Sequence, residues 1–246
     1  MSDDGRALRA PVIAGNWKMH KGPAETREFL RAFSRSFAAR QDRTVALFPP
    51  SLSLTVAVAE LRERADIRLG VQNIHWEAQG AFTGEISAAM AREAGADIAL
   101  IGHSERRHVF GETDDQVRRK VAAALTAGLF PMICVGETLA ERRAGRVEEV
   151  ILRQLDAALA GLPAAALPAA IAYEPVWAIG TGETATPEDA AAAHATLRRR
   201  LTERLGEARS RDLPILYGGS VKPDNAAELL RAPAVDGLLG GGASLD

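Results

Sequence analysis

Polar side chains that can carry or transfer a proton stand at the ends of three short apolar stretches of the chain. They are Asn16, Lys18, His103, Ser104, Glu105 and Glu174. A carboxylate can serve as a general base, an imidazole can share a proton with a substrate oxygen, and an ammonium group can stabilise negative charge. Together these residue types indicate proton-transfer chemistry, provided that the fold brings the three segments to one place.

Glycine-rich turns follow two further apolar stretches, at residues 218–220, which read GGS, and at residues 240–242, which read GGG. Backbone N–H groups at glycines can approach an anion closely, and the start of a helix favours negative charge. Each glycine could instead belong to an ordinary turn. If the fold places the two turns together, they suit a phosphate group.

The segment PVWAIGTG, which follows Glu174, could be a surface loop, a nucleotide-binding turn or a lid over the acid. Residues 180–185 fit the dinucleotide pattern G-x-G-x-x-A, but that pattern should follow its strand at once, and residues 174–179 intervene. Glu203, the acid at about the right distance, falls inside a predicted helix. These mismatches argue against a dehydrogenase and favour a lid over residues 175–181.

Eight short apolar runs alternate with longer stretches of amphipathic sequence. The runs are 11–16, 43–48, 67–72, 96–102, 129–135, 169–174, 213–219 and 235–240. Most are apolar throughout, which is typical of parallel strands buried on both faces. Eight strand–helix units in this length favour a closed (β/α)8 barrel over an open sheet, as one catalytic domain over residues 11–246 after a polar extension at 1–10. Barrels carry their chemistry at the carboxyl ends of the strands and commonly bind phosphate after strands seven and eight.

Helix signals lie between the apolar runs. Residues 114–128 place Val117, Val121 and Leu125 in a helical pattern and end at a glycine. Residues 186–206 begin with Thr186 as a predicted N-cap, followed by a proline at a position that suits the first turn. Only GGASLD follows the last run, so we expect the eighth helix to be short or missing.

Composition and charge argue against several classes of protein. The formal net charge of −2 gives no reason to expect nucleic acid as a partner. No apolar run approaches the ~20 residues of a membrane span, so we expect no membrane partner and a cytoplasmic location. The single cysteine, Cys134, allows no disulfide within the chain. No H-E-x-x-H motif or cysteine–histidine cluster indicates a metal.

Six segments, in order along the chain, resemble the diagnostic segments of the triosephosphate isomerase family. They are AGNWKMH, QNIHWEAQGAFTGEIS, IGHSERR, AYEPVWAIGTG, YGGSV and GGASL. The resemblance covers the chain from near Pro11 to its end. It implies interconversion of dihydroxyacetone phosphate and D-glyceraldehyde 3-phosphate through an enediolate, with no cofactor. It also implies a homodimer that acts in the cytoplasm, in glycolysis and gluconeogenesis.

The resemblance assigns catalytic roles to the polar residues at the strand ends. Glu174 would be the general base, with its pKa raised by burial under the lid. His103 would hydrogen-bond the substrate oxygens as a neutral imidazole, with its pKa lowered by the start of a short helix. Lys18 would be a buried cation that stabilises the enediolate and pairs with Glu105. Asn16 would orient both Lys18 and the substrate.

Binding roles follow from the same resemblance. Phosphate would be held by the backbone N–H groups of Gly180, Ser220, Gly241 and Gly242. Ser104 and Glu105 would contact and position the catalytic side chains without contacting the substrate. Thr83 lies on the long loop 72–85 and would reach into the partner's site near Asn16. An exposed loop of this length itself suggests that something covers it.

Two other barrel functions remain as alternatives. A catalytically idle phosphate-binding barrel would keep the glycine turns and lose Glu174 or His103, yet both are present. A Schiff-base aldolase needs a neutral lysine, but pairing with Glu105 would keep Lys18 protonated. The chain also departs from the family pattern at Gly240, where a branched residue is usual, so we expect a looser phosphate turn.

Overall fold

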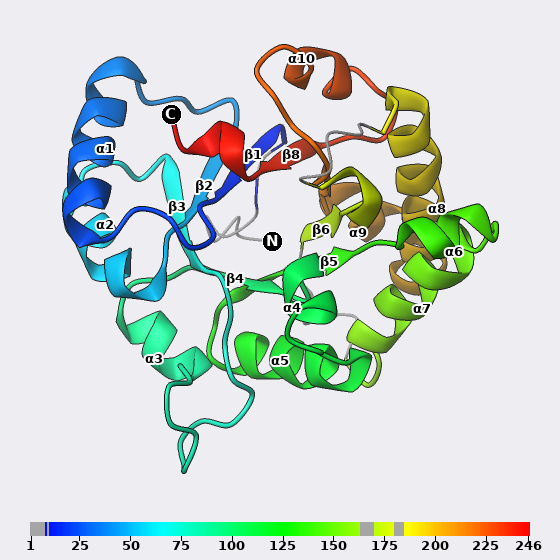
Figure 1. The fold of residues 1–246 in the computed structure, drawn as a ribbon, viewed down its shortest axis with the longest axis horizontal. Coiled ribbons are helices and arrows are strands. Elements are labelled where there is room, and N and C mark those ends of the chain that lie inside the picture. Colours follow the sequence, from blue (N-terminus) through cyan, green and yellow to red (C-terminus); the bar gives the residue numbers. More distant parts are fainter. Residues whose placement is uncertain (1–7, 9, 163–169, 180–184) are drawn as a thin grey trace.

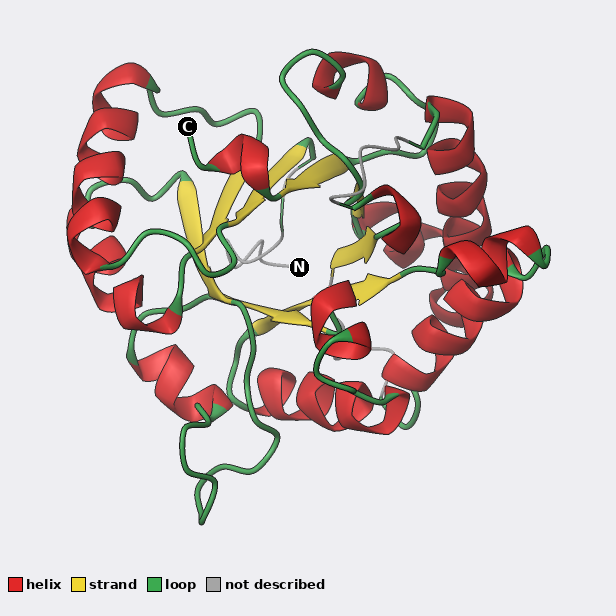
Figure 2. Ribbon diagram, in the orientation of Figure 1, coloured by secondary structure: helices red, strands yellow, loops and turns green. Residues whose placement is uncertain are grey.

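A computed structural model describes residue 8 and residues 10–162, 170–179 and 185–246. Eight parallel strands close into a barrel in sequence order, as Figures 1 and 2 show. The strands are β1 Val12–Asn16, β2 Thr44–Phe48, β3 Ile67–Val71, β4 Ile98–Ile101, β5 Phe130–Val135, β6 Ala170–Tyr173, β7 Ile215–Tyr217 and β8 Gly237–Gly240. Every strand lies within one of the predicted apolar runs, so the (β/α)8 barrel is confirmed.

The barrel closes where β8 pairs with β1, with Val12 opposite Gly237. The two backbones approach so closely there that a Cβ atom at position 237 would lie 2.1 Å from the carbonyl oxygen of Val12. A larger residue at this position would push the closing strands apart. Gly237 is therefore required by the close approach of the two strands.

Alternate residues of each strand pack on opposite sides of the barrel wall. In β5, Met132 and Cys134 belong to an inner cluster shared with residues of β1, β2, β4 and β6 to β8. Ile133 and Val135 pack instead in a second cluster, together with residues of the surrounding helices. Because both faces of the wall are buried, both sets of positions must be apolar, which explains the uninterrupted apolar runs.

Helices cover the outside of the barrel (Figure 2). They are α1 Pro23–Ser36, α2 Leu54–Glu60, α3 Ala88–Glu93, α4 Ser104–His108, α5 Asp114–Thr126, α6 Leu139–Arg143, α7 Val147–Ala158, α8 Pro187–Leu205, α9 Glu207–Asp212 and α10 Ala226–Leu229, with 3-10 turns η1 Ser51–Ser53, η3 Val176–Ala178 and η4 Gly242–Ser244. Thr113 caps α5 and Thr186 caps α8, as the residue types favour. In the part of the chain that the structure describes, no helix is long and apolar enough to cross a membrane.

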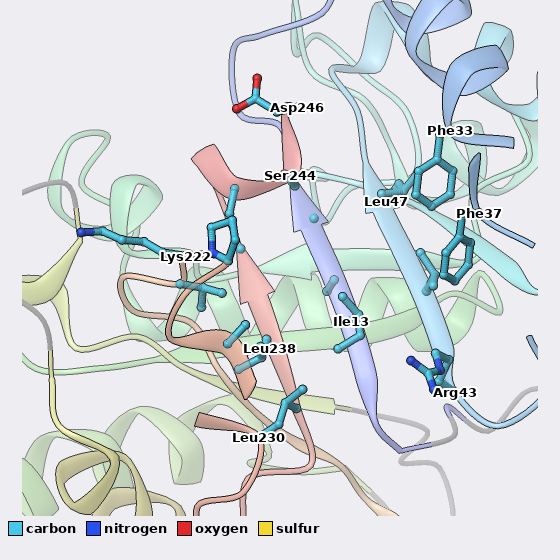
Figure 3. A pocket seen from close by; sticks show the side chains of 18 of the residues that line it. Ile13, Phe33, Phe37, Arg43, Leu47, Lys222, Leu230, Leu238, Ser244 and Asp246 are labelled. Atoms are coloured by element: carbon cyan, nitrogen blue, oxygen red, sulfur yellow. The ribbon is translucent and has the colours of Figure 1, made fainter. Parts of the chain in front are cut away.

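Within the described residues, the segment after β8 contains the 3-10 turn η4, and the expectation of a short or missing eighth helix stays a prediction. An apolar groove of about 390 Å³ lies beside β8 and β1. Figure 3 shows Phe33 and Phe37 of α1 on one wall of the groove and Leu230 and Leu238 on the other.

His194, on α8, is a fully buried titratable residue of the helical shell. Its Nδ1 atom lies 2.9 Å from the carbonyl oxygen of Ala234, and its ring meets that of Tyr173 edge to face. Burial disfavours the charged imidazolium and lowers the pKa of His194 to about 4. The folded protein therefore holds this ring uncharged at neutral pH.

We expect His194→Gln to remove part of the acid sensitivity of the fold. His194 binds a proton near pH 4 when folded but near pH 6.5 when unfolded, so its stabilisation is complete above about pH 6.5. That stabilisation is lost as the pH falls toward 4, by roughly 3 kcal/mol. Urea denaturation gives the free energy of unfolding of the native protein and of the variant at neutral pH and near pH 4. The difference between the two free energies should be smaller near pH 4 by this amount. His108 is an exposed histidine, so His108→Gln is the control and should not change the acid sensitivity. A difference that is independent of pH would contradict the prediction.

Candidate active site

The polar residues predicted to act together lie around one pocket of about 300 Å³ at the carboxyl ends of the strands. Its lining includes Asn16, Lys18, His103, Glu174, Ser220, Gly241 and Gly242. These residues end or follow β1, β4, β6, β7 and β8, and a parallel barrel places all of these strand ends on one rim. The fold thus brings together residues that lie far apart in the sequence.

The side chain of Glu174 is held by two donors deep in this pocket. Its Oε2 atom accepts the backbone N–H of Ser104 at 2.8 Å, and its Oε1 atom lies 3.0 Å from Nε2 of His103. Glu174 is only 2% exposed. Ser104, predicted to support the catalytic groups, therefore contacts the predicted base through its backbone.

His103 forms the N-cap of α4, and this position defines its tautomer. Its Nδ1 atom accepts the backbone N–H of Glu105 at 3.2 Å, so in this arrangement Nδ1 carries no proton. The ring proton then lies on Nε2, which donates to Glu174. The geometry thus favours the neutral imidazole that the sequence analysis expects.

The pKa of His103 is nevertheless raised, which corrects the expectation that it would be lowered. Burial lowers the pKa, but the carboxylates of Glu174 and Glu105 favour the protonated ring and outweigh burial. Helix α4 has only five residues, so its dipole is a weak opponent of two nearby carboxylates.

The pKa of Glu174 also differs from the expected direction. Burial raises it, but His103, the N–H of Ser104 and the positive charge of Lys18 together lower it below the ordinary value. The expected direction followed from burial alone, without the effect of these three partners on the pKa. With the side chain in this position, Glu174 is a stabilised carboxylate and a weaker base than an isolated buried acid would be.

Lys18 stands at the mouth of the site in an unusual backbone conformation, with φ of 51°. Its backbone N–H donates to Oδ1 of Asn16 at 3.0 Å, and its Nζ atom lies 2.6 Å from Oε1 of Glu105. The expected pairing of Lys18 with Glu105 is therefore present. The Lys18 side chain is 28% exposed, so this cation is partly rather than fully buried.

Gln72 is a residue that the sequence analysis missed at this position. Its Nε2 atom donates to the carbonyl oxygens of Lys18, at 2.8 Å, and Phe48, at 2.9 Å. These bonds hold the strained backbone of Lys18 against the end of β2. An amide at the end of an apolar run was visible in the sequence, but its two acceptors lie on other segments, one in the loop after β1 and one at the end of β2.

The segment after Glu174 is attached to the barrel by an acid from the neighbouring strand end. Trp177, in η3, donates its indole N–H to Oε1 of Glu137 at 2.8 Å. The hydroxyl of Tyr173 lies 3.1 Å from the same carboxylate. This anchor places residues 175–179 beside the pocket. Gly180, predicted to bind phosphate, lies outside the described residues together with the rest of 180–184.

The two glycine-rich turns also line the pocket. A Cβ atom at Gly241 would lie 3.4 Å from Cε of Lys18, so this turn runs directly beside the cation. Gly240 has more room, because a Cβ atom there would meet only the carbonyl oxygen of Ala14, at 3.9 Å. The expectation of a looser turn at Gly240 stays a prediction.

Gly136, directly after β5, is a second residue whose importance the sequence did not reveal. Its N–H donates to Oε1 of Gln154 at 2.8 Å, and Nε2 of Gln154 donates back to its carbonyl oxygen at 3.1 Å. A Cβ atom at position 136 would lie 1.7 Å from the carbonyl oxygen of Glu174. Gly136 therefore determines how closely the backbone of the predicted base can approach β5.

A metal centre has no support in the described part of the chain, where no group of three or more histidine, cysteine or acidic side chains is placed to hold an ion. The charged groups of the pocket instead contact one another. The pocket presents a carboxylate, an imidazole and an ammonium group.

Comparison with known proteins decides the family. The family model described as triosephosphate isomerase matches residues 11–246. The chain belongs to the triosephosphate isomerase family. Relatives with that name include one from Herpetosiphon aurantiacus, 50% identical over 97% of this chain and 95% of its own, and one from Solibacter usitatus, 48% identical over 97% and 96%. The crystal structure of triosephosphate isomerase from Bartonella henselae matches with a TM-score of 0.86 and 44% identity, over 96% of this chain and 94% of its own.

Membership of the triosephosphate isomerase family gives the arm 72–85 a context. The arm leaves the barrel between β3 and α3 and projects away from it (Figure 1). Thr83, on this arm, is exposed. It lines a surface pocket together with residues of α4 and α5 of the same chain, and its contact with a partner subunit stays a prediction.

We expect Gly136→Ala to impair catalysis by displacing Glu174. The added methyl group would overlap the Glu174 carbonyl, so the backbone must move by about an ångström, and such a misplacement can cost about 10²-fold in rate. Steady-state isomerisation kinetics and a thermal melt would measure the effect. Gly22→Ala is a matched control, because a Cβ atom there meets nothing within 4 Å. A folded Gly136→Ala protein with native kcat would refute the role assigned to Gly136.

Proposed function

We propose that the protein interconverts dihydroxyacetone phosphate and D-glyceraldehyde 3-phosphate, with Glu174 as the general base. The observation that carries the proposal is the meeting of Glu174, His103 and Lys18 around one pocket that the glycine turns also line. The family of the chain supports the same reaction. Glu174 would remove a proton from the carbon beside the carbonyl group and return it to the neighbouring carbon.

The held position of Glu174 implies a movement before catalysis. Its carboxylate is occupied by the N–H of Ser104 and by Nε2 of His103, so it must turn away from both to reach a substrate carbon. Leaving these donors removes the interactions that lower its pKa, so the carboxylate becomes a stronger base. The same movement frees the Nε2–H of His103 to donate to the substrate oxygens, and the N–H of Glu105 keeps the ring in that tautomer.

Charge on the intermediate would be stabilised from the β1 side. Lys18 lies beside the turn at Gly241 and can face both an enediolate oxygen and a phosphate group. Asn16 accepts the N–H of Lys18 and so supports its orientation. Backbone N–H groups at Ser220, Gly241 and Gly242 would hold the phosphate, with Gly180 as a further donor from the lid segment.

The alternatives are less well supported by the pocket. An idle phosphate-binding barrel has no use for a buried carboxylate in contact with an imidazole, since the two cost desolvation free energy that binding alone does not recover. A Schiff-base aldolase would use Lys18 as a nucleophile, but its ion pair with Glu105 favours the ammonium form.

A homodimer that acts in the cytoplasm is part of the same proposal. Large apolar side chains are exposed on the arm and beside the mouth of the site, including Phe82, at 42%, Leu52, at 83%, and Met19, at 94%. Met19 and Leu52 line one surface pocket, and exposed apolar patches can mark interaction sites. We infer that the arm of one subunit, which carries Thr83, covers the loop after β1 of the other.

We expect Glu174→Gln to lower kcat by at least about 10²-fold, because the amide cannot accept the carbon-bound proton. Incubation with dihydroxyacetone phosphate in deuterated water should give isomerisation with deuterium on carbon for the native protein, and almost none for the variant. Glu188→Gln, at an exposed position on α8, is the control and should behave as native. Absence of exchange in the native protein would support the idle barrel instead.

We expect Phe82→Asp to dissociate the dimer, because a charge would be buried where the arm docks. Sedimentation velocity should show the native protein as a dimer and the variant as a monomer at low micromolar concentration. Ala195→Asp adds the same charge to an exposed position of α8, away from the arm, and should leave the dimer intact. A native protein that sediments as a monomer would refute this part of the proposal.

A further inference from the structure

The turn after β7 is held by a side chain that belongs to the next helix. Asn225 occupies the N-cap position of α10, yet its side chain makes no cap hydrogen bond to that helix. It reaches back along the chain instead. Its Nδ2 atom donates to the carbonyl oxygen of Ser220 at 2.9 Å, and its Oδ1 atom accepts the backbone N–H of Lys222 at 2.8 Å.

These two bonds immobilise the downstream side of the turn. Both the Ser220 carbonyl and the Lys222 N–H are tied to one planar amide group, so the peptides between them cannot rotate independently. The upstream side is tied separately, because the N–H of Gly218 donates to the carbonyl oxygen of Tyr173 at 2.7 Å. Ser220 therefore sits between two anchors, one on β6 and one on Asn225.

The orientation of the Ser220 backbone affects the pocket because Ser220 is one of the residues that line it. Ser220 and Lys222 both line the pocket around Glu174 and Lys18. An N–H group binds an anion well only when it points at the anion, so a turn that is held before the ligand arrives binds more tightly than one that must be ordered. The side chain of Asn225 bonds to this turn instead of capping α10, which indicates that its main structural contribution is to the turn.

We propose that Asn225 is a positioning residue for phosphate binding: its amide group holds the turn 220–222 so that the Ser220 N–H points at the phosphate of the substrate. This inference rests on the proposed function, in which Ser220 binds that phosphate. Asn225 touches no substrate and acts through Ser220 and Lys222 alone. Its loss should therefore weaken the binding of phosphate-bearing molecules and leave proton transfer at Glu174 largely unchanged.

The test compares Asn225→Ala and Asn225→Ser with the native protein. Alanine removes both bonds, whereas serine removes the reach of the amide but keeps a residue that is favourable at an N-cap, so that α10 still forms. Asp224→Ala is the matched control, because this exposed neighbour makes no hydrogen bond or ion pair with the described residues. Calorimetry with inorganic phosphate gives the dissociation constant, and steady-state kinetics give KM and kcat separately.

We expect both Asn225 variants to raise the dissociation constant of inorganic phosphate and the KM of the triose phosphate by about tenfold, as the loss of one or two hydrogen bonds predicts. Their kcat should stay within about threefold of native, and Asp224→Ala should match the native protein. Phosphate binding within twofold of native in both Asn225 variants would overturn the inference, as would a loss that appears in kcat alone. If the native protein binds phosphate but isomerises nothing, the proposed function fails, and the calorimetric comparison still decides the role of Asn225.

Discussion

Closure of a parallel barrel places the carboxyl end of every strand on one rim, and the whole site depends on this constraint. Lys18 and Glu105 pair across a sequence separation of 87 residues, and the Ser104 N–H reaches Glu174 across 70. No local structure could bring these groups together. The barrel in turn depends on close contacts of backbone with backbone, such as that of Gly237 with Val12 at the closing pair of strands.

Within that rim, electrostatic pairing determines what each group can do. A fully buried carboxylate would ordinarily be protonated more easily, yet Glu174 remains a stabilised anion because His103 and the Ser104 N–H face it. In the proposed mechanism, Glu174 is an unreactive carboxylate until its side chain turns. Turning would also release His103, so one movement would prepare both the proposed base and the proposed hydrogen-bond donor.

Residues with no proposed catalytic role hold the residues of the pocket in position. Gln72 holds the strained backbone of Lys18, Gly136 leaves room for the backbone of Glu174, and Asn225 holds the turn at residues 220–222. None of the three carries a charge, and none has a reactive side chain that would mark it in the sequence. Their effects come from contacts with main-chain atoms of other segments, which leave little trace in residue type or spacing.

The sequence alone determined the strands, because burial on both faces demands uninterrupted apolar runs, and it determined which polar residues stand at the strand ends. Thr186 likewise marked the start of α8 through local capping chemistry. Only the tertiary structure decided the directions of the pKa shifts of Glu174 and His103. The sequence reveals that a group is buried, whereas its pKa depends on partners a few ångströms away in space, and only the closed barrel determines which partners those are.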